Sequence, residues 1–199
     1  MKKYTIDTNV LLSDPNSIIA FDGATVVLPF TVLEELDSIK SRNVDVSRDA
    51  RVAIRNIEAI ISDATHDEIS TSGVNIADVH TNMDAASKLF VITNEEAESI
   101  IRLSEKEESV QTLIHSTVPD DKIILVALAT ESVLVTRDIN MRIKALSYGV
   151  EVQDYRHDVV IGDSDLIHVG QHHLEINFWD VYSNLTDVNI HSEQVGRRL

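Results

Sequence analysis

Hydrophobic residues along the chain follow two spacings, one typical of buried strands and one typical of helices. Short runs rich in β-branched and aromatic residues predict strands, and those runs are residues 3–6, 25–28 and 133–136. Shorter apolar stretches at residues 74–79 and 150–152 predict two further strands. Apolar residues at helical spacing predict helices over residues 14–21, 32–40, 47–61, 95–108, 123–129 and 138–148.

Capping residues mark where these helices should begin and end. Asp14 followed by Pro15 predicts the start of the first helix, because Asp caps a helix and Pro suits its first position. Ser47 and Asp138 are predicted to cap two later helices, and Gly149 is predicted to end the last one.

The strand–helix order predicts an α/β protein with a mostly parallel central sheet and helices on both faces. The 199 residues include only 6 glycines and 3 prolines, too few for the many tight turns of an all-β fold. We expect one domain over residues 1–155. Residues 156–199 are predicted to form an extension that packs on this domain or links it to an absent region.

The predicted extension contains two short β-prone runs that flank a polar turn, so a hairpin is expected over residues 167–176. His168, His172 and His173 lie in this hairpin. The group lacks a further paired ligand, and we therefore interpret it as an exposed polar turn and not as a zinc site.

Composition excludes several classes of protein. The chain has no cysteine, which excludes disulfide scaffolds, Cys-ligated zinc, iron–sulfur clusters and thiol nucleophiles. No stretch has the ~18–20 apolar residues of a membrane-spanning helix, so we expect a cytoplasmic protein with no membrane partner. The net charge is −16, from 17 basic and 33 acidic residues, and it disfavours a basic groove for nucleic acid. Carboxylates gathered around a divalent cation are the exception, because the bound ion offsets their charge.

Four carboxylates occur where such a gathering would need them, since ligands of a parallel sheet bind at the carboxyl ends of its strands. They follow strands or begin helices at one expected edge of the sheet, and they are Asp7, Glu35, Asp120 and Asp138. Oxygen ligands without His or Cys favour Mg²⁺ or Mn²⁺. Each residue also has a structural interpretation: a turn for Asp7, a solvated helix face for Glu35, and a helix cap for the other two. The residues alone leave both interpretations open.

The segments around these carboxylates resemble the motifs of PIN-domain nucleases, in the same order along the chain. The segments are Asp-Thr-Asn-Val-Leu-Leu (7–12), Val-Leu-Glu-Glu-Leu-Asp (32–37), Asp-Asp-Lys-Ile-Ile-Leu-Val-Ala (120–127) and Val-Thr-Arg-Asp-Ile-Asn (135–140). Residues 11–15 and 138–145 look more narrowly like the PIN half of PhoH-type proteins. The resemblance covers residues 3–155 and implies a three-layer α/β/α fold.

The resemblance implies a ribonuclease that uses Mg²⁺ or Mn²⁺ to hydrolyse single-stranded RNA, and dimers are common in the family. It assigns metal binding and catalysis to Asp7, Glu35, Asp120 and Asp138, and a supporting role to Thr8, Asn9, Thr136 and Asn140. Many PIN domains have an aspartate where this chain has Asn140, a departure that would weaken a second metal position. Glu35 is preferred over Glu34, and Asp120 over Asp121, because their spacing from neighbouring apolar residues fits the family motifs.

Two other functions remain open. A haloacid-dehalogenase-type phosphatase needs Asp-x-Asp after its first strand, and the sequence here is Asp7-Thr8-Asn9, which disfavours it. A degenerate PIN scaffold that binds RNA or a protein partner is disfavoured by the four retained carboxylates. None of the 6 glycines is followed by Lys, so the ATPase half of PhoH-type proteins is not expected in this sequence.

One basic segment stands out in the acidic chain. Arg48, Arg51 and Arg55 fall at helical spacing, where pairing with nearby acids is the simpler interpretation. The alternative is that they contact the RNA backbone beside the active site.

Overall fold

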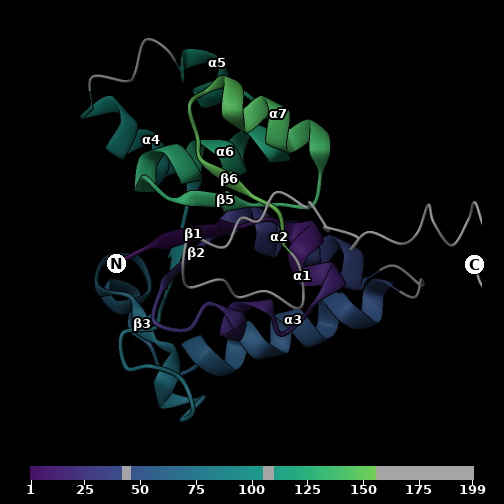
Figure 1. Ribbon diagram of the computed structural model, residues 1–199, viewed down its shortest axis with the longest axis vertical. Coiled ribbons are helices and arrows are strands. Elements are labelled where there is room, and N and C mark those ends of the chain that lie inside the picture. The colour runs from purple at the N-terminus through teal and green to yellow at the C-terminus, as the bar shows by residue number, and fades with distance from the viewer. Residues whose placement is uncertain (42–45, 105–109, 156–199) are drawn as a thin grey trace, which may run out of the picture. The chain divides into compact units, whose positions relative to one another are not determined.

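The computed structural model describes residues 1–41, 46–104 and 110–155. A six-stranded sheet with the strand order β3-β4-β2-β1-β5-β6 forms its centre (Figure 1). The strands are β1 (Lys3–Ile6), β2 (Thr25–Pro29), β3 (Val74–Asn75), β4 (Lys88–Ile92), β5 (Val133–Val135) and β6 (Val152–Gln153). Only β3 is antiparallel to its neighbour, and every other pair of adjacent strands is parallel.

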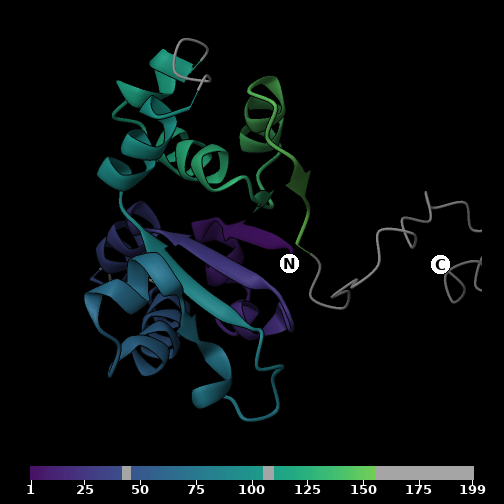
Figure 2. The same cartoon turned by 90° about the vertical axis from the view of Figure 1, so that its left-hand side faces the viewer.

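Helices cover both faces of the sheet, with α1 and α3 on one side and α4, α6 and α7 on the other (Figures 1 and 2). The helices are α1 (Thr8–Ser13), α2 (Phe30–Lys40), α3 (Val46–Ile61), α4 (Asn94–Arg102), α5 (Gln111–Ile114), α6 (Pro119–Thr130) and α7 (Ile139–Ser147). Shorter turns are η1 (Ser17–Ala20), η2 (Glu68–Ser72) and η3 (Ile76–Asp78). The predicted α/β class is therefore confirmed. No helix in the described ranges is long and apolar enough to cross a membrane.

The core lies between the sheet and these helices. All five residues of β2 are buried, as expected for a strand covered on both faces. Residues 123–129 of α6 are also all buried, because this helix packs on β1 and β2 and is enclosed by α4 and α5.

Strand register brings the carboxyl ends of the central strands to one edge of the sheet. Ile6 pairs with Val135 of β5, and Pro29 pairs with Ile92 of β4. The residues that follow these strands therefore begin side by side, although they are distant in the sequence.

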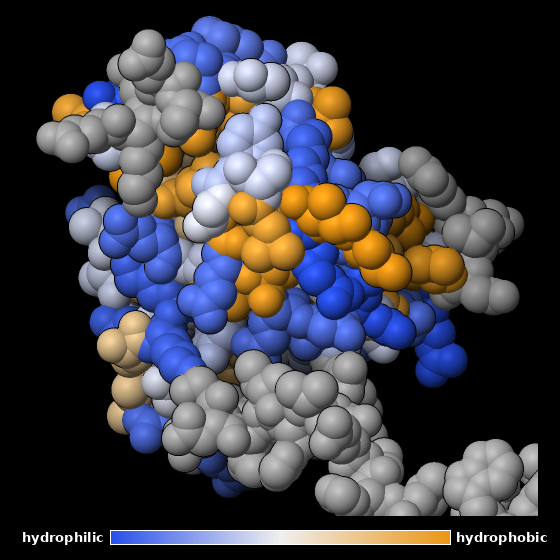
Figure 3. Space-filling view, turned by 45° about the horizontal axis from the view of Figure 1, so that its top comes forward, coloured by the Kyte–Doolittle hydropathy of each residue, from blue (hydrophilic) through white to orange (hydrophobic). Residues whose placement is uncertain are grey.

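Some apolar side chains face solvent. Figure 3 shows hydrophobic surface between hydrophilic areas. On α7, Ile139, Ile143 and Leu146 are all exposed, while Met141 and Ala145 are buried. The apolar pattern that predicted this helix therefore comes from two faces, and only one of them contacts the core.

The structure corrects the prediction for residues 65–94. Strand β4 was missed, although it lies inside the sheet between β3 and β2. Its sequence Lys-Leu-Phe-Val-Ile is a short apolar run, and such a run does not distinguish a strand from a helix. The strand predicted at 74–79 ends after Asn75, whose side chain accepts a hydrogen bond from the Ala77 amide and starts η3.

The helix predicted over residues 14–21 is wrong. Helix α1 instead occupies residues 8–13 and ends at Asp14, and only the short turn η1 follows. Asp14 is the C-cap of α1, and its carboxylate accepts hydrogen bonds from the Asn16 amide and the Tyr155 hydroxyl, so it does not begin a helix as predicted.

Other helix boundaries also differ from the sequence prediction. Ser47 is not the cap of its helix, because α3 begins one residue earlier at Val46. Helix α4 ends at Arg102, before the predicted 108, and residues 105–109 lie outside the described residues. The predicted extension 156–199, with its hairpin and histidines, also lies outside them.

Two glycines with similar backbone angles allow a test of the packing around β3. Gly73 (φ 77°) and Gly149 (φ 78°) both adopt the left-handed region, but a Cβ at Gly73 would clash with the Phe90 ring, whereas a Cβ at Gly149 would have no described atom within 4 Å. Gly149→Ala should cost about 1–2 kcal/mol of unfolding free energy from backbone strain. Gly73→Ala should cost roughly 1–3 kcal/mol more, because the Phe90 ring must move. Urea unfolding of both variants checks this, and equal losses would contradict it.

Candidate active site

The candidate site lies at the carboxyl end of β1, the strand from which the chain first continues to one side of the sheet and later to the other. β1 has β2 on one side and β5 on the other, so the connections from this centre run outward in opposite directions. In parallel sheets, ligands bind in the crevice outside the carboxyl ends of the strands at such a switch point. The residues that follow β1 and β5 define this place in the chain.

Asp7 follows β1 directly and is only 5% exposed. Its backbone amide donates to the Val135 carbonyl oxygen at 3.1 Å, which continues the pairing of β1 with β5. Its carboxylate Oδ2 accepts a hydrogen bond from Thr136 Oγ1 at 2.7 Å. Two adjacent strands therefore fix the backbone and the side chain of Asp7.

The Thr136 hydroxyl, which is fully buried, has all of its hydrogen-bonding capacity in use. It accepts from Asn9 Nδ2 at 3.2 Å and from the Asp138 amide at 3.0 Å. Since a hydroxyl has one proton, that proton goes to Asp7. Asn9 Oδ1 accepts from the Arg137 amide at 3.1 Å and so fixes the amide orientation of Asn9.

Burial raises the pKa of Asp7 from its ordinary value of 3.8 to about 6. Hydrogen bonds from the Thr136 side chain and the Thr8 backbone oppose this shift, while the charges of Asp120 and Glu35 add to it. Three of the four predicted carboxylates are therefore close enough to repel one another.

Glu35 and Asp120 reach this place from two helices. Glu35 is half-buried on α2 and accepts a hydrogen bond from the Thr8 hydroxyl, whereas Glu34 is exposed. Asp120 is exposed in the first turn of α6. Its neighbour Asp121 is buried, forms an ion pair with Lys144 and accepts from Ser116 Oγ at 2.6 Å.

Asp138 caps a helix, which is the structural role that the sequence left open. It caps α7, where its Oδ1 accepts from the amides of Asn140 at 2.7 Å and Met141 at 3.3 Å. It is not among the charges that shift the pKa of Asp7. Asn140 is exposed and contributes only this backbone contact.

The three arginines of the basic segment are all exposed on α3. Arg51 donates to the Lys40 carbonyl oxygen at 3.1 Å. Neither Arg48, Arg51 nor Arg55 forms an ion pair with another described residue. Pairing with acidic residues of the described chain therefore does not account for the three arginines on this helix.

The carboxylates are near one another but do not form a coordination shell. Within residues 1–41, 46–104 and 110–155, no group of three or more His, Asp or Glu side chains has the arrangement of a metal site. Mutual repulsion keeps uncompensated carboxylates apart, and a cation would be needed to draw them together. The donor set consists of carboxylate oxygens only, of which those of Asp7 are buried and those of Glu35 half-buried, and it fits a hard divalent cation.

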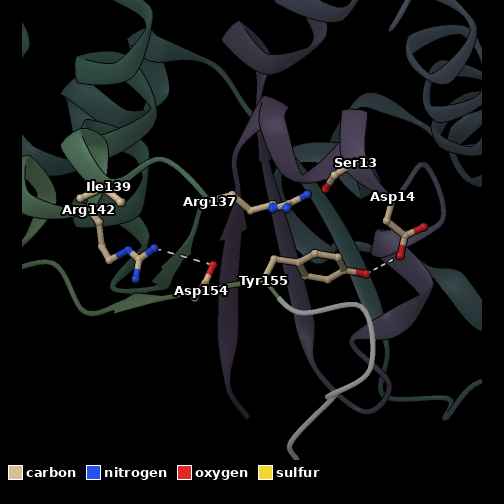
Figure 4. Close-up of a pocket in the computed structure, with 7 residues that line it drawn as sticks. All are labelled: Ser13, Asp14, Arg137, Ile139, Arg142, Asp154 and Tyr155. Atoms are coloured by element: carbon tan, nitrogen blue, oxygen red, sulfur yellow. Dashed lines mark hydrogen bonds and ion pairs between the residues drawn. The ribbon is translucent and has the colours of Figure 1, made fainter. Parts of the chain in front are cut away.

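Sequence analysis missed a cavity beside these residues. It has a volume of about 440 Å³, and its lining consists of Ser13, Asp14, Arg137, Ile139, Arg142, Asp154 and Tyr155 (Figure 4). The one sequence signal for this cavity was Arg137, which lies between Thr136 and Asp138 in the quoted motif. The other lining residues come together only in the fold.

The fold defines an α/β protein in which acidic residues gather at the carboxyl edge of a mostly parallel sheet. A family model described as PIN domain matches residues 4–156, and the chain belongs to this family. The predicted resemblance is thereby confirmed.

Curated relatives support the narrower resemblance to PhoH-type proteins. The chain is 30% identical over 187 residues to Protein PhoH2 of Bacillus subtilis, which covers 88% of this chain and 38% of the relative. It is 27% identical over 161 residues to Protein PhoH2 of Thermobispora bispora, covering 80% of this chain and 33% of the relative. The chain thus spans well under half the length of either relative. Among solved structures, a domain of a functionally unknown protein from Methanocaldococcus jannaschii aligns at a TM-score of 0.48 and 18% identity, covering 84% of this chain and 99% of that one.

The raised pKa of Asp7 predicts how stability depends on pH without metal. Because the native state binds the Asp7 proton more tightly than the unfolded state, stability is lost as pH rises from about 4 to about 6. Asp7→Asn removes this charge, so at pH 7 it should stabilise the metal-free protein by roughly 2–3 kcal/mol. The gain should disappear below pH 4.

Urea unfolding in EDTA at pH 3.5, 5 and 7 measures this difference. Asp22→Asn provides a control, because Asp22 is exposed and lies before β2, away from the site. A gain from Asp7→Asn that is the same at all three pH values would exclude the buried-charge explanation.

Proposed function

We propose that the chain is a divalent-metal-dependent endoribonuclease that hydrolyses phosphodiester bonds of single-stranded RNA. The observation that supports it best is the buried Asp7 at the switch point of the sheet, in the field of Asp120 and Glu35. Burying the Asp7 carboxylate there costs stability, and such a cost is expected when the carboxylate serves to bind a cation. Membership of the PIN family supplies the reaction class.

In this proposal Asp7, Glu35, Asp120 and Asp138 hold Mg²⁺ or Mn²⁺. Asp138 uses Oδ1 for the cap of α7, which leaves Oδ2 for a ligand role. A bound divalent ion supplies Lewis-acid stabilisation of phosphoryl oxygens and a water of lowered pKa. No covalent intermediate on the protein is required.

The neighbouring polar residues orient the carboxylates. Thr136 donates to Oδ2 of Asp7 and so fixes the rotation of that carboxylate. Thr8 does the same for Glu35, and Asn9 holds Thr136 in place. These contacts pre-organise the acidic groups, which reduces the cost of arranging them when metal and RNA bind.

The proposal extends to the setting of the reaction. Residues 1–155 form the nuclease domain, and residues 156–199 an extension of it, in a cytoplasmic protein that acts as a monomer or a homo-oligomer. The longer PhoH2 relatives are consistent with a nuclease domain that functions alone or within a larger protein.

A non-catalytic scaffold is the second candidate. The capping role of Asp138 favours it. It predicts RNA or protein binding without cleavage, so an activity assay separates the two.

The adjacent pair Asp120 and Asp121 gives a sharp test of the site. Asp120→Asn should reduce Mn²⁺-dependent cleavage of a labelled single-stranded RNA at least about 100-fold, because a metal-bound carboxylate is worth several kcal/mol. Its unfolding free energy should be unchanged or higher. Asp121→Asn should retain cleavage but lose about 1–3 kcal/mol of stability, since it breaks the buried pair with Lys144.

Both variants are compared with the wild-type protein in parallel cleavage assays and urea titrations. If Asp121→Asn is the inactive variant and Asp120→Asn is not, the assignment within the pair is wrong. If the wild-type protein cleaves no RNA with Mn²⁺ or Mg²⁺, the non-catalytic scaffold is the better function.

Metal binding should itself stabilise the protein. A ligand that binds only the native state adds RT ln(1 + [L]/Kd), or about 2.7 kcal/mol at a hundredfold excess over Kd. The melting temperature should therefore rise with Mn²⁺ in the wild-type protein and much less in Asp7→Asn. An unchanged wild-type melting curve in millimolar Mn²⁺ would contradict a metal site.

A further inference from the structure

The cavity shown in Figure 4 lies at the carboxyl edge of β5 and β6, next to the candidate active site. The end of α1, the connection between β5 and α7, and the residues after β6 form its walls. Arg137 follows Thr136 directly, and Thr136 contacts the Asp7 carboxylate at 2.7 Å. The cavity and the acidic site therefore share one short segment of backbone.

Two arginines supply positive charge to this cavity. Arg137 is exposed, and its side chain has no hydrogen bond or ion pair with any described residue. Its backbone is nevertheless fixed, because its amide donates to Asn9 Oδ1 at 3.1 Å. Arg142 Nη2 lies 3.7 Å from Asp154 Oδ1, and Arg142 Nε is buried without a partner. Figure 4 shows the Arg137 side chain directed toward Ser13 and that of Arg142 toward Asp154.

The acidic residues of the cavity are already engaged. Asp14 is buried, and it accepts from the Asn16 amide at 3.0 Å and from the Tyr155 hydroxyl. Burial and the Asp14 carboxylate hold the pKa of the Tyr155 phenol above its usual range, so Tyr155 remains a neutral donor. Asp154 faces Arg142 at a distance too long for a tight hydrogen bond, and an anion can compete for that guanidinium.

A chain with a net charge of −16 repels an RNA strand over most of its surface. An RNA-cleaving site in such a protein needs local cations beside it to hold the strand. The cavity meets this need, because its volume of about 440 Å³ is in the range of small-ligand sites and its arginines suit phosphate geometry. Ile139 and Tyr155 add an apolar wall for a base or ribose.

We propose that the Arg137–Arg142 cavity binds a phosphate and its nucleotide in the RNA strand, one or more positions away from the phosphate that is cleaved. The inference rests on the proposed function and adds a substrate-binding subsite to it. Arg137 makes the principal phosphate contact, and Arg142 exchanges its weak contact with Asp154 for a second one.

Binding experiments on a labelled single-stranded 12-nucleotide RNA in EDTA test the subsite without cleavage. Arg137→Gln should weaken binding about 5–20-fold at low salt, and the slope of log Kd against log salt should fall by about 0.7, the value for one lost phosphate contact on a single strand. The double variant Arg137→Gln/Arg142→Gln should lose about twice that slope. Arg102→Gln is the matched control, because Arg102 is an exposed arginine at the end of α4 that pairs with Glu98 at 3.6 Å.

Neutral methylphosphonate linkages, placed one at a time along the RNA, locate the contact. The wild-type protein should bind more weakly when the neutral linkage stands at one position outside the cleavage site. The affinity of Arg137→Gln should not change when the linkage at that position is neutral. Thermal melting checks that each variant is folded. Since Arg137 has no side-chain partner in the described structure, its variant should melt like the wild-type protein even if Arg142→Gln is less stable.

The outcomes separate the subsite from the nuclease activity. If Arg137→Gln and the double variant bind RNA with wild-type affinity and salt slope, the subsite is wrong, and the nuclease proposal stands if the wild-type protein cleaves RNA with Mn²⁺. If the wild-type protein binds RNA through these arginines but never cleaves it, the subsite stands and the nuclease proposal fails. If the wild-type protein neither binds nor cleaves single-stranded RNA, both are overturned.

Discussion

The hydrogen bond from Thr136 to Asp7 is the interaction on which the rest of the site depends. It joins the ends of β1 and β5 through two residues 129 positions apart in sequence, of which Thr136 is fully buried and Asp7 is only 5% exposed. A buried carboxylate without a donor would be strongly destabilising, so the Thr136 hydroxyl and the Thr8 backbone together make the burial of Asp7 possible. Because Asn9 and the Asp138 amide use the remaining capacity of the hydroxyl, the same bond fixes the whole connection from β5 to α7.

This arrangement weakens the fold locally, and the surrounding core offsets the loss. Burial raises the pKa of Asp7, and Asp120 and Glu35 raise it further, so the native state at neutral pH contains uncompensated repulsion. The buried strand β2 and the fully buried middle of α6 lie beneath this edge and supply apolar burial without polar cost. The apolar core of β2 and α6 and the repelling carboxylates are thus adjacent but formed by different residues.

Sequence alone predicted much of the fold, because the central strands are buried on both faces. Residues of β1, β2 and β5 form runs whose composition suits only that environment. β4 escaped detection because its short apolar run, Lys-Leu-Phe-Val-Ile, does not distinguish a strand from a helix. α1 escaped detection because the sequence suggests that Asp14 begins a helix. The carboxylate of Asp14 instead accepts hydrogen bonds from the Asn16 amide, two residues later, and from Tyr155, 141 residues away.

The candidate site was predictable to the extent that topology determines it. Residues directly after parallel strands meet at one edge, as Asp7 does, and the first turns of helices that begin at that edge bring Glu35 and Asp120 to it, so the three could be grouped from their positions. Spacing also favoured Asp120 over Asp121, but the reason became visible only in space, where Lys144 reaches Asp121 from α7. Capping by Asp138 was one of two interpretations that the sequence allowed, and no sequence pattern could tell them apart.

The connection between β5 and α7 explains how the acidic edge of the sheet and the neighbouring cavity can share one short segment of chain. Three residues separate the last residue of the strand from the first of the helix: Thr136, Arg137 and Asp138. Thr136 is buried against Asp7, Arg137 extends to the cavity, and Asp138 turns to the exposed amides of α7. Since successive side chains of an extended backbone point in different directions, a fixed Thr136 also fixes where Arg137 points. Any shift of the Asp7–Thr136 contact would therefore move the arginine together with the carboxylate, so one hydrogen bond links the geometry of the proposed metal site to that of the proposed RNA subsite.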